Sequence, residues 1–359
     1  MIAPPLGIGI IGFGRIGAEH AGWIAAAGPG VAPVAVADAT PARQALAASR
    51  GLKVYPEIDA MLVDSGVGAV LVSTPTAMHF EHASRALAAG KHVMVEKPIA
   101  LDLAQSLALV DDARRRGLLL SVFHNRRWDV DYLTVKTAIA SGAFGKLINV
   151  ESRLGQYASC VGPAAREYRP NWRNEGSFGG GGLYDWGSHF VDQLWRLLWP
   201  AKPVRVYAQL RGNVWSADCD DFARVLMDFD DGNPALAPGV VGLVEINTTT
   251  TRPLPRWHLD GTAGSAFSPY SPEFDTKVWA SLRFTPAKAG EPSRTFAMAP
   301  PGLTESQIWE AFAAAARGSG DLAVGAASVL PTMALLDAAR ESSRSGRAVD
   351  VRDAVEWVI

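Results

Sequence analysis

The feature that most constrains the fold of this chain is a regular alternation of short apolar runs and helical stretches over residues 6–123. The runs VAVA, AVLV and HVMV are continuously apolar, as expected of strands covered by helices on both faces. Strands that alternate with helices of about 10–15 residues are typical of right-handed βαβ units and a parallel sheet. We expect strands at 6–11, 34–37, 52–55, 69–73, 92–96 and 118–123, and helices at 15–27, 41–50, 57–64, 79–89 and 101–116.

The pattern changes after residue 123, where strand-like runs follow one another without helices between them. Such runs are typical of an α+β domain with a large, mostly antiparallel open sheet. We therefore expect two domains, 1–123 and 124–359, and leave open whether the closing helix packs back on the first. The expected strands are 146–154, 204–210, 222–229, 240–250, 256–261 and 277–284, and the expected helices are 131–141, 183–198, 306–316 and 330–343.

Composition excludes several classes of protein. Apolar residues make up 48% and charged residues 19% of the 359, so a sizeable core can form and disorder is excluded. The 34 basic and 36 acidic residues argue against a globally basic nucleic-acid binder. Cys160 and Cys219 are too few for a disulfide framework, and no cluster has metal-ligand spacing, so we expect no metal. With no long apolar run and no basic residues before the first strand, we expect a cytoplasmic protein with no membrane span.

A glycine-rich turn, GFGRIG, follows the first expected strand and opens the first expected helix. In this pattern the first glycine permits the tight turn, the second lets the backbone approach a pyrophosphate, and the third lets helix and strand pack closely. The alternative is a tight turn followed by an ordinary helix start. The nucleotide-binding interpretation includes the whole motif: Gly12, Phe13, Gly14, Arg15, Ile16 and Gly17.

Asp38 ends the second strand about 20 residues beyond the glycines, the place from which an acid holds the ribose 2′-hydroxyl of NAD. A carboxylate there repels a 2′-phosphate, so the sequence favours NAD over NADP, with NADP use left open. Arg43 is near enough in sequence to reach a 2′-phosphate, but we interpret it as an exposed helix charge.

Three further motifs follow in order: Thr74-Pro75 with His79, then Glu96-Lys97-Pro98, then GGGGLYDWGSH at residues 179–189. With the glycine-rich turn they resemble the Gfo/Idh/MocA oxidoreductase family, which includes glucose–fructose oxidoreductase and inositol dehydrogenases. The resemblance covers almost the whole chain, and the EKP and D-x-x-x-H motifs are its most specific part. It implies an NAD(P)-binding Rossmann domain at 1–123 and a substrate-binding and oligomerisation domain at 124–359. Residues 122–129, VFHNRRWD, resemble the branch with NADP-dependent scyllo-inositol dehydrogenases, from which Asp38 departs.

Lys97, Asp185 and His189 are the expected catalytic residues. Asp185 and His189 are spaced i, i+4 and share one face of a helix, and an imidazole titrates near neutrality, which suits a proton acceptor. Lys97 follows a strand of the parallel sheet, at the edge where ligands of such sheets bind. Together they fit oxidation of a secondary alcohol: His189 takes the proton, Lys97 stabilises the alkoxide, and Asp185 orients the pair. Whether Lys97 or His189 moves the proton is left open.

Structural alternatives exist for each of these residues. Asp185 and His189 could form only a stabilising pair, and Lys97 could merely close a turn with Glu96 as its ion partner. His79 could equally cap its helix. The resemblance instead implies that the turns after the fourth and fifth strands lie near the nicotinamide. The cofactor-side candidates are Ser73, Thr74, Pro75, His79, Glu96 and Lys97.

The segment from Tyr157 to Gly182 is long, glycine-rich and aromatic, which is typical of a binding loop. Flat aromatic faces suit the C–H faces of a sugar or cyclitol ring, and arginines can bond its hydroxyls. The alternative is packing against a partner subunit. The expected substrate contacts are Arg127, Tyr157, Tyr168, Trp172 and Arg173, with Lys97, Asp185 and His189.

The sequence thus predicts an NAD-dependent dehydrogenase acting on a cyclitol, sugar or sugar derivative. One alternative is redox-neutral glycoside cleavage through a transient keto sugar with tightly held NAD, and another is a non-catalytic NAD(P)-binding sensor. The broad second sheet should leave one face uncovered, which is a candidate homo-oligomer interface. The resemblance implies dimers or tetramers.

Overall fold

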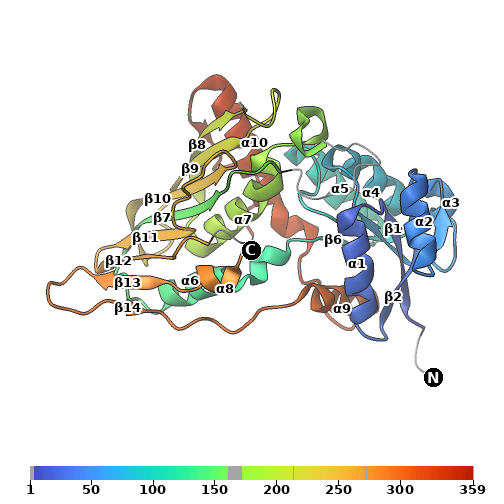
Figure 1. Ribbon diagram of the computed structural model, residues 1–359, viewed down its shortest axis with the longest axis horizontal. Coiled ribbons are helices and arrows are strands. Elements are labelled where there is room, and N and C mark those ends of the chain that lie inside the picture. The colour runs from blue at the N-terminus through green and yellow to red at the C-terminus, as the bar shows by residue number, and fades with distance from the viewer. Residues whose placement is uncertain (1–3, 161–171, 213, 272–273, 359) are drawn as a thin grey trace. The chain divides into compact units, whose positions relative to one another are not determined.

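The computed structural model describes residues 4–160, 172–212, 214–271 and 274–358 (Figure 1). These residues form two compact units, each assembled from separate stretches of the chain. The first unit contains the described parts of Met1–Asn125, Val161–Gly179 and Leu303–Leu330. The second contains those of Arg126–Cys160, Gly180–Gly302 and Pro331–Ile359. The chain therefore returns to the first unit twice, and its closing helix belongs to the second.

The first unit is built on a parallel sheet of six strands in the order β3-β2-β1-β4-β5-β6. The register runs from Leu6 opposite Val31 and from Ile8 opposite Ala69, which makes β1 central. The strands are β1 (Leu6–Ile11), β2 (Val31–Ala37), β3 (Lys53–Tyr55), β4 (Ala69–Val72), β5 (His92–Val95) and β6 (Leu120–Val122).

Helices connect successive strands of this sheet, and α9 packs on α1 (Figure 1). Local signals fix their ends: Asp102 caps α5 by accepting a hydrogen bond from the Gln105 N–H, and Gly117 ends it in the left-handed conformation. The helices are α1 (Arg15–Ala26), α2 (Pro41–Ser49), α3 (Ile58–Leu62), α4 (His79–Ala88), α5 (Leu103–Arg116) and α9 (Glu305–Ala316).

The second unit contains a sheet of nine strands in the order β14-β13-β12-β11-β7-β10-β9-β8-β15. Only the pairing of β7 with β10 is parallel among the described strands, and the others are antiparallel. The strands are β7 (Leu147–Gly155), β8 (Pro203–Arg211), β9 (Phe222–Phe229), β10 (Leu236–Asn247), β11 (Trp257–Gly261), β12 (Gly264–Phe267), β13 (Arg283–Pro286), β14 (Arg294–Thr295) and β15 (Val349–Asp350).

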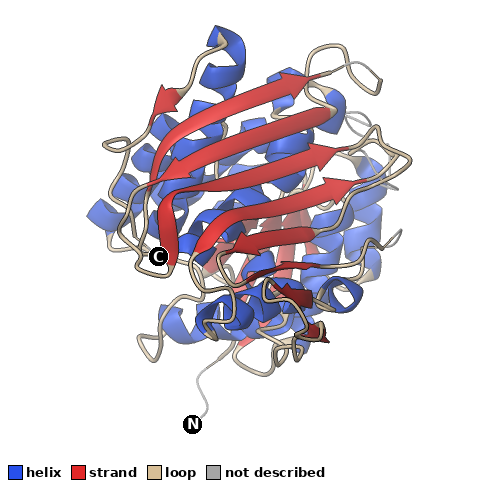
Figure 2. Ribbon diagram, turned by 90° about the vertical axis from the view of Figure 1, so that its left-hand side faces the viewer, coloured by secondary structure: helices blue, strands red, loops and turns tan. Residues whose placement is uncertain are grey.

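One face of this sheet carries helices and the other is open among the described residues (Figure 2). Helix α7 packs against β7 and β10, and side chains of α10 bond the backbone of β8. The open face presents alternate residues of the strands, including Tyr207 and Arg224. The helices are α6 (Val130–Ala140), α7 (Ser188–Leu198), α8 (Thr276–Trp279) and α10 (Leu330–Ser345).

The expected fold class is confirmed: a doubly wound parallel sheet is followed by a large, mostly antiparallel sheet. One expected element is wrong. Residues 277–284 do not form a strand, because Asp275 caps helix α8 by accepting hydrogen bonds from the Lys277 and Val278 N–H groups. Strand β13 begins only at Arg283. The local cap outweighs the strand propensity of this short run.

Within the described part of the chain, no helix is both long and apolar enough to cross a membrane.

Candidate functional site

The glycine-rich turn joins β1 to α1 in a shape that only glycine allows at two places. Gly12 has φ of +87°, and a Cβ there would lie 2.8 Å from the Thr74 side chain. A Cβ on Gly17 would lie 2.2 Å from the Gly12 carbonyl oxygen, so helix and strand are packed too closely for alanine. Gly14 differs, because the nearest atom to an added Cβ is the Arg43 guanidinium at 3.6 Å. The turn therefore has no space for a side chain at Gly12 or Gly17, whereas at Gly14 there is space for an added group.

The N-terminus of α1 is suited to an anion. Its N-cap is Gly14, no described side chain caps it, and its first turn carries no acidic residue. The first N–H groups of a helix lack partners within the helix and carry the positive end of its dipole. Together with the room at Gly14, this geometry fits the pyrophosphate of a dinucleotide.

Asp38 is bound to the backbone of the glycine-rich turn. Its Oδ2 accepts a hydrogen bond from the Phe13 N–H at 2.6 Å, and its Oδ1 accepts one from the Thr40 N–H at 2.8 Å. The residue is only 9% exposed. A carboxylate oxygen has two lone pairs, so each oxygen can still accept a ribose hydroxyl. Asp38 therefore lies where the NAD interpretation requires a carboxylate.

The interpretation of Arg43 as an exposed helix charge is wrong. Its side chain is 15% exposed, and its Nη1 lies 4.0 Å from Asp38 Oδ2. Arg43 lies in the first turn of α2, and helical side chains point back toward the N-terminus, which brings its guanidinium over Gly14. A positive charge thus stands beside Asp38 and reduces the repulsion that the carboxylate alone would exert on a 2′-phosphate.

The turn after β4 supports the glycine-rich turn from the neighbouring strand. Ser73 donates its hydroxyl hydrogen bond to the Gly12 carbonyl at 2.8 Å. Thr74 Oγ1 lies 3.0 Å from His82 Nδ1. Pro75 precedes a 3₁₀ turn, Thr76–Met78, that leads into α4. The residues after β1 and β4 are therefore joined by side-chain to backbone hydrogen bonds.

His79 holds two turns together from a buried position. Its Nδ1 lies 2.8 Å from the Pro98 carbonyl oxygen, and its Nε2 lies 2.9 Å from the Thr74 carbonyl oxygen. Burial lowers the pKa of His79, against the two carbonyl groups, which favour the charged ring. At 1% exposure the ring acts on the turns after β4 and β5 through their backbones.

Lys97 stands in the turn after β5, half-buried, and its peptide bond to Pro98 is cis. Glu96 Oε2 accepts the Lys97 backbone N–H at 3.0 Å, and Glu96 Oε1 bonds His20 Nε2 at 2.8 Å. Burial works to raise the pKa of Glu96, but the hydrogen bond from His20 and the charge of Lys97 hold it below its usual value. Glu96 is therefore an ionised group inside the first unit.

Part of the expected substrate loop is docked on this edge of the first unit. Gly179 has φ of +72°, and a Cβ there would lie 2.7 Å from Leu101 and 3.1 Å from Thr76. Trp172 and Arg173 precede it in a 3₁₀ turn, with the guanidinium 4.3 Å from the indole centre. These two expected substrate contacts thus share a unit with Lys97, whereas Tyr168 lies outside the described residues.

Asp185 and His189 lie in the second unit, where a π-helical turn, Leu183–Gly187, runs into α7. Asp185 is half-buried and His189 is 4% exposed. Single π turns inside α-helices are frequent at functional sites. The i, i+4 spacing of Asp185 and His189 was expected to lie on a regular α-helix, and part of it lies instead on the wider π turn.

Asp220 secures the start of this turn and was missed by the sequence reasoning. Its Oδ2 accepts the Leu183 N–H at 2.8 Å, its carbonyl accepts the Gly182 N–H at 2.8 Å, and a Cβ on Gly181 would lie 2.3 Å from its Oδ1. Burial raises the pKa of Asp220 to about 7. The adjacent acids of the DD pair, after a polar loop, were the only signal that could have indicated it.

The two remaining expected substrate contacts, Arg127 and Tyr157, differ in their surroundings. Arg127 forms two bonds of 2.8 Å to Asp192, one turn beyond His189 on α7, so its guanidinium is held by that helix. Tyr157 is 56% exposed and lies edge-on to Trp215, with ring centres 5.3 Å apart. The Arg127 guanidinium is therefore paired within the second unit and its contact with substrate stays a prediction, whereas Tyr157 is available at the surface of that unit.

The first unit thus brings together the glycine-rich turn, Asp38, the turn after β4, Glu96 and Lys97. Asp185 and His189 both lie in the second unit, on consecutive turns of one helical segment. Within the described residues no group of three or more His, Cys, Asp or Glu side chains is arranged to hold a metal ion.

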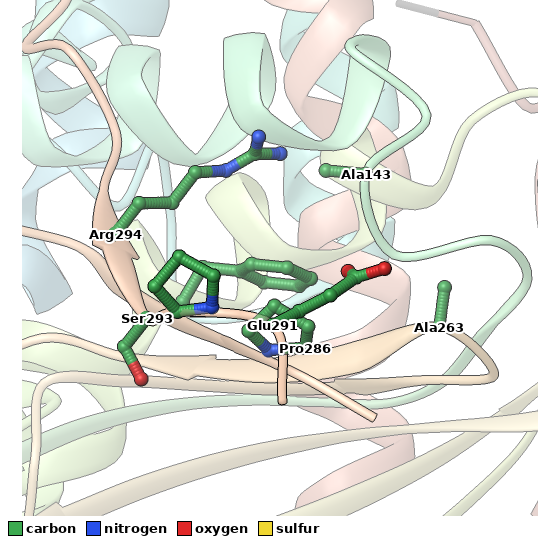
Figure 3. Close-up of a pocket in the computed structure, with 8 residues that line it drawn as sticks. Ala143, Ala263, Pro286, Glu291, Ser293 and Arg294 are labelled. Carbon is green, nitrogen blue, oxygen red and sulfur yellow. The ribbon is translucent and has the colours of Figure 1, made fainter. Parts of the chain in front are cut away.

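A cavity of about 400 Å³ lies at β13 and β14 of the second unit (Figure 3). Its lining combines apolar side chains with the charged groups of Glu291 and Arg294. None of the expected site residues is among its lining residues, which are Ala143, Ala263, Phe284, Pro286, Glu291, Pro292, Ser293 and Arg294. This cavity does not support the predicted site.

Comparisons with known proteins identify two family domains in this chain. The model of an oxidoreductase family with an NAD-binding Rossmann fold matches residues 6–124, and that of the GFO/IDH/MocA C-terminal domain matches residues 132–267. The solved structure of an NAD-binding protein from Listeria innocua is similar with a TM-score of 0.82 and 28% identity, covering 96% of both chains.

Two relatives of Bacillus subtilis (strain 168) carry specific names. IolW, a scyllo-inositol 2-dehydrogenase (NADP(+)), is 32% identical over 177 residues, 49% of this chain and 47% of that protein. A scyllo-inositol 2-dehydrogenase (NAD(+)) is 33% identical over 141 residues, 39% of this chain and 41% of that protein. The matched region spans about half the length of the first curated relatives. With both family domains matched in order on the expected fold, this chain belongs to the Gfo/Idh/MocA oxidoreductase family.

Proposed function

We propose that this protein is an NAD-dependent dehydrogenase that oxidises a secondary alcohol of a cyclitol, sugar or sugar derivative. One observation carries the proposal: β1, β4 and β5 are adjacent strands of one parallel sheet. The glycine-rich turn, the Ser73–Pro75 turn and Lys97 follow these strands directly, so all three lie along the same edge of the sheet. Ligands of such sheets bind at this edge. A dinucleotide cradle with a lysine beside it fits hydride transfer.

The cofactor would lie with its pyrophosphate at the N-terminus of α1 and its ribose hydroxyls at Asp38. When bound, the nicotinamide accepts the hydride from the substrate carbon. Asp38 favours NAD, and the neighbouring Arg43 leaves a lower activity with NADP. The names of relatives that use either cofactor are consistent with this mixed charge.

The chain's own residues would hold and move the proton. Lys97 donates a hydrogen bond to the substrate oxygen and stabilises the negative charge that develops there. His189 takes the hydroxyl proton, and Asp185 orients the imidazole. Trp172, Arg173 and Tyr157 would contact the ring of the substrate, and His79 would act through the two turns it joins.

The partners we propose are a small polyol or sugar and a second copy of the chain. The open face of the nine-stranded sheet supports self-association, because the large apolar side chains of Tyr207 and Phe267 on its strands are exposed.

The test of function is reduced-nicotinamide formation over a panel of inositols, aldoses and glycosides, with NAD and NADP in parallel. We expect turnover of a ring polyol, faster with NAD. Release of an aglycone without net NADH would replace this proposal with redox-neutral glycoside cleavage. Cofactor binding without any turnover would replace it with a sensor.

The cradle can be tested separately with a matched pair of glycines. Gly14→Ala adds a methyl group where the protein has room, so we expect a folded protein with NAD affinity reduced about 10-fold or more. Gly17→Ala meets a carbonyl oxygen at 2.2 Å, so we expect loss of stability as well. Unchanged NAD affinity in Gly14→Ala would contradict the proposed position of the pyrophosphate.

A further inference from the structure

We propose that His20 and Trp309 are positioning residues for Lys97, acting through the carboxylate of Glu96. This inference rests on the proposed function of Lys97. It extends the site to two buried residues from α1 and α9, which lie outside all of the motifs that indicated the site.

A continuous series of hydrogen bonds links α9, α1 and the turn after β5 within the first unit. The Trp309 indole N–H donates to His20 Nδ1 at 3.0 Å. His20 Nε2 bonds Glu96 Oε1 at 2.8 Å, and Glu96 Oε2 accepts the Lys97 backbone N–H at 3.0 Å. The indole of α9 is thereby connected to the backbone of Lys97 through one imidazole and one carboxylate.

The chemistry of these groups determines which atom donates and which accepts in each hydrogen bond. An indole N–H is only a donor, so Nδ1 of His20 must be the acceptor. The ring then carries its proton on Nε2, and this N–H donates a hydrogen bond to Glu96. Glu96 in turn accepts one N–H on each oxygen, which fixes the rotation of its carboxylate. Trp309 therefore selects the tautomer of His20 that can bind Glu96.

Because these groups are buried, the loss of one of their hydrogen bonds is costly. His20 and Trp309 are fully buried and Glu96 is 8% exposed, so water does not replace a lost partner easily. The His20 ring is packed edge-on against Trp23, Phe123 and Trp309, with ring centres 4.8, 4.3 and 5.7 Å away. An imidazole confined by three aromatic rings has little freedom to turn away from Glu96.

The position of α9 explains why Trp309 is available. A capping box at Thr304 and Gln307 starts the helix, and the Asn125 amide donates to Glu305 at 3.2 Å. Helix α9 packs on α1, which carries His20. The return of the chain to the first unit thus supplies a donor that the βαβ units themselves lack at this place.

Kinetics of paired variants test the proposal. Trp309→Phe keeps an aromatic ring and removes the N–H, so we expect kcat to fall about 3- to 10-fold, the rate equivalent of one hydrogen bond, with KM for NAD changed less than about twofold. Trp23→Phe alters the same aromatic cluster without this bond and serves as the control, with kcat near that of the parent protein. His20→Leu should lower kcat at least as much as Trp309→Phe, and His20→Gln, which keeps an amide donor, should restore part of it. Equal kcat in the Trp309→Phe and parent proteins would overturn the proposal.

Two measurements on the protein without substrate separate this inference from the proposed function. Long-range ¹H–¹⁵N spectra should show the His20 ring proton on Nε2, where it faces Glu96, and a proton on Nδ1 would overturn the proposal. Exchange of the Lys97 amide hydrogen should be faster in Trp309→Phe than in Trp23→Phe, and equal exchange in both would overturn it too. If the parent protein turns over no polyol while both results hold, the proposed function fails and the positioning of the Lys97 backbone stands.

Discussion

The candidate residues of the first unit and those of the second unit are held in place by different means. In the first unit, side chains from distant parts of the chain fix the Lys97 turn: His20 through Glu96, and His79 through the Pro98 carbonyl. In the second unit, the turn that carries Asp185 begins with glycines packed directly against Asp220, which accepts the Leu183 N–H. The first arrangement relies on aromatic and imidazole groups, and the second on close backbone contact.

This difference predicts different responses to substitution. Removing a supporting side chain in the first unit should change the rate more than the stability, because the parallel sheet holds the strand ends independently. Filling space in the second unit should change the stability first, because no flexible group separates the glycine turn from Asp220.

The largest effect is expected from Lys97 itself. Lys97→Ala removes the group that we propose to stabilise the alkoxide, so kcat/KM should fall about 10²- to 10⁴-fold while NAD still binds. Steady-state kinetics with fluorescence titration of NAD would measure both. Activity close to that of the parent protein would show that the site is assigned to the wrong edge of the sheet.

A matched pair of glycines tests the second unit. Gly181→Ala forces a side chain into φ of +101° and against Asp220, and we expect the free energy of unfolding to fall by about 2–4 kcal/mol. Gly239→Ala has φ of +72° with open space around it, so only the backbone cost of about 1 kcal/mol is expected. Equal losses in urea unfolding would mean that contact with Asp220 does not matter.

The pH dependence of stability follows from Asp220. Burial raises the pKa of Asp220 to about 7 from the ordinary value of 3.8, so between these pH values the folded protein keeps a proton that the unfolded chain has lost. Stability contributed by this group is therefore present at low pH, falls as pH rises from about 4 to 7, and stays lost above that range.

Asp220→Asn keeps an oxygen acceptor for Leu183 and removes the titration. We expect its stability to fall less steeply with pH, by up to about 1.4 kcal/mol per pH unit. The remaining slope would include Asp129, whose pKa burial also raises to about 7. Thermal unfolding of both proteins between pH 5 and 8, by circular dichroism, measures the difference. Parallel curves would contradict the assignment.

The smallest effect is expected at Arg43. Its guanidinium stands between Asp38 and Gly14, so Arg43→Ala should weaken NADP binding about 3- to 10-fold and NAD binding less. Calorimetric titration of both cofactors gives the ratio. An equal loss of affinity for NAD and NADP would indicate that Arg43 contacts a part of the cofactor that both share.

Local patterns were sufficient for most of the fold. The continuous apolar runs and helical stretches of residues 6–123 predicted the positions of all six parallel strands along the chain, because a fully buried strand must be apolar on both faces. The run at 277–284 misled, because a single acid, Asp275, starts a helix there. The two-residue strands β14 and β15 carry no periodicity and exist only through pairing with a neighbour.

The site was predictable only where its residues are neighbours in sequence. The glycine-rich turn with Asp38, and the EKP turn, are local motifs with a chemical reason for each residue. His20 and Trp309 are 289 positions apart, so only the folded structure relates them. The pairing of Arg127 with Asp192 is likewise visible only in the folded structure, and its expected contact with substrate stays a prediction.

The most direct test of the central claim follows the hydride itself. A ring polyol deuterated at the carbinol carbon is incubated with the protein and NAD, and the reduced cofactor is analysed by mass spectrometry. The account predicts deuterium in the reduced nicotinamide from the parent protein and almost none from Lys97→Ala. Reduced cofactor without deuterium, or equal transfer by both proteins, would contradict it.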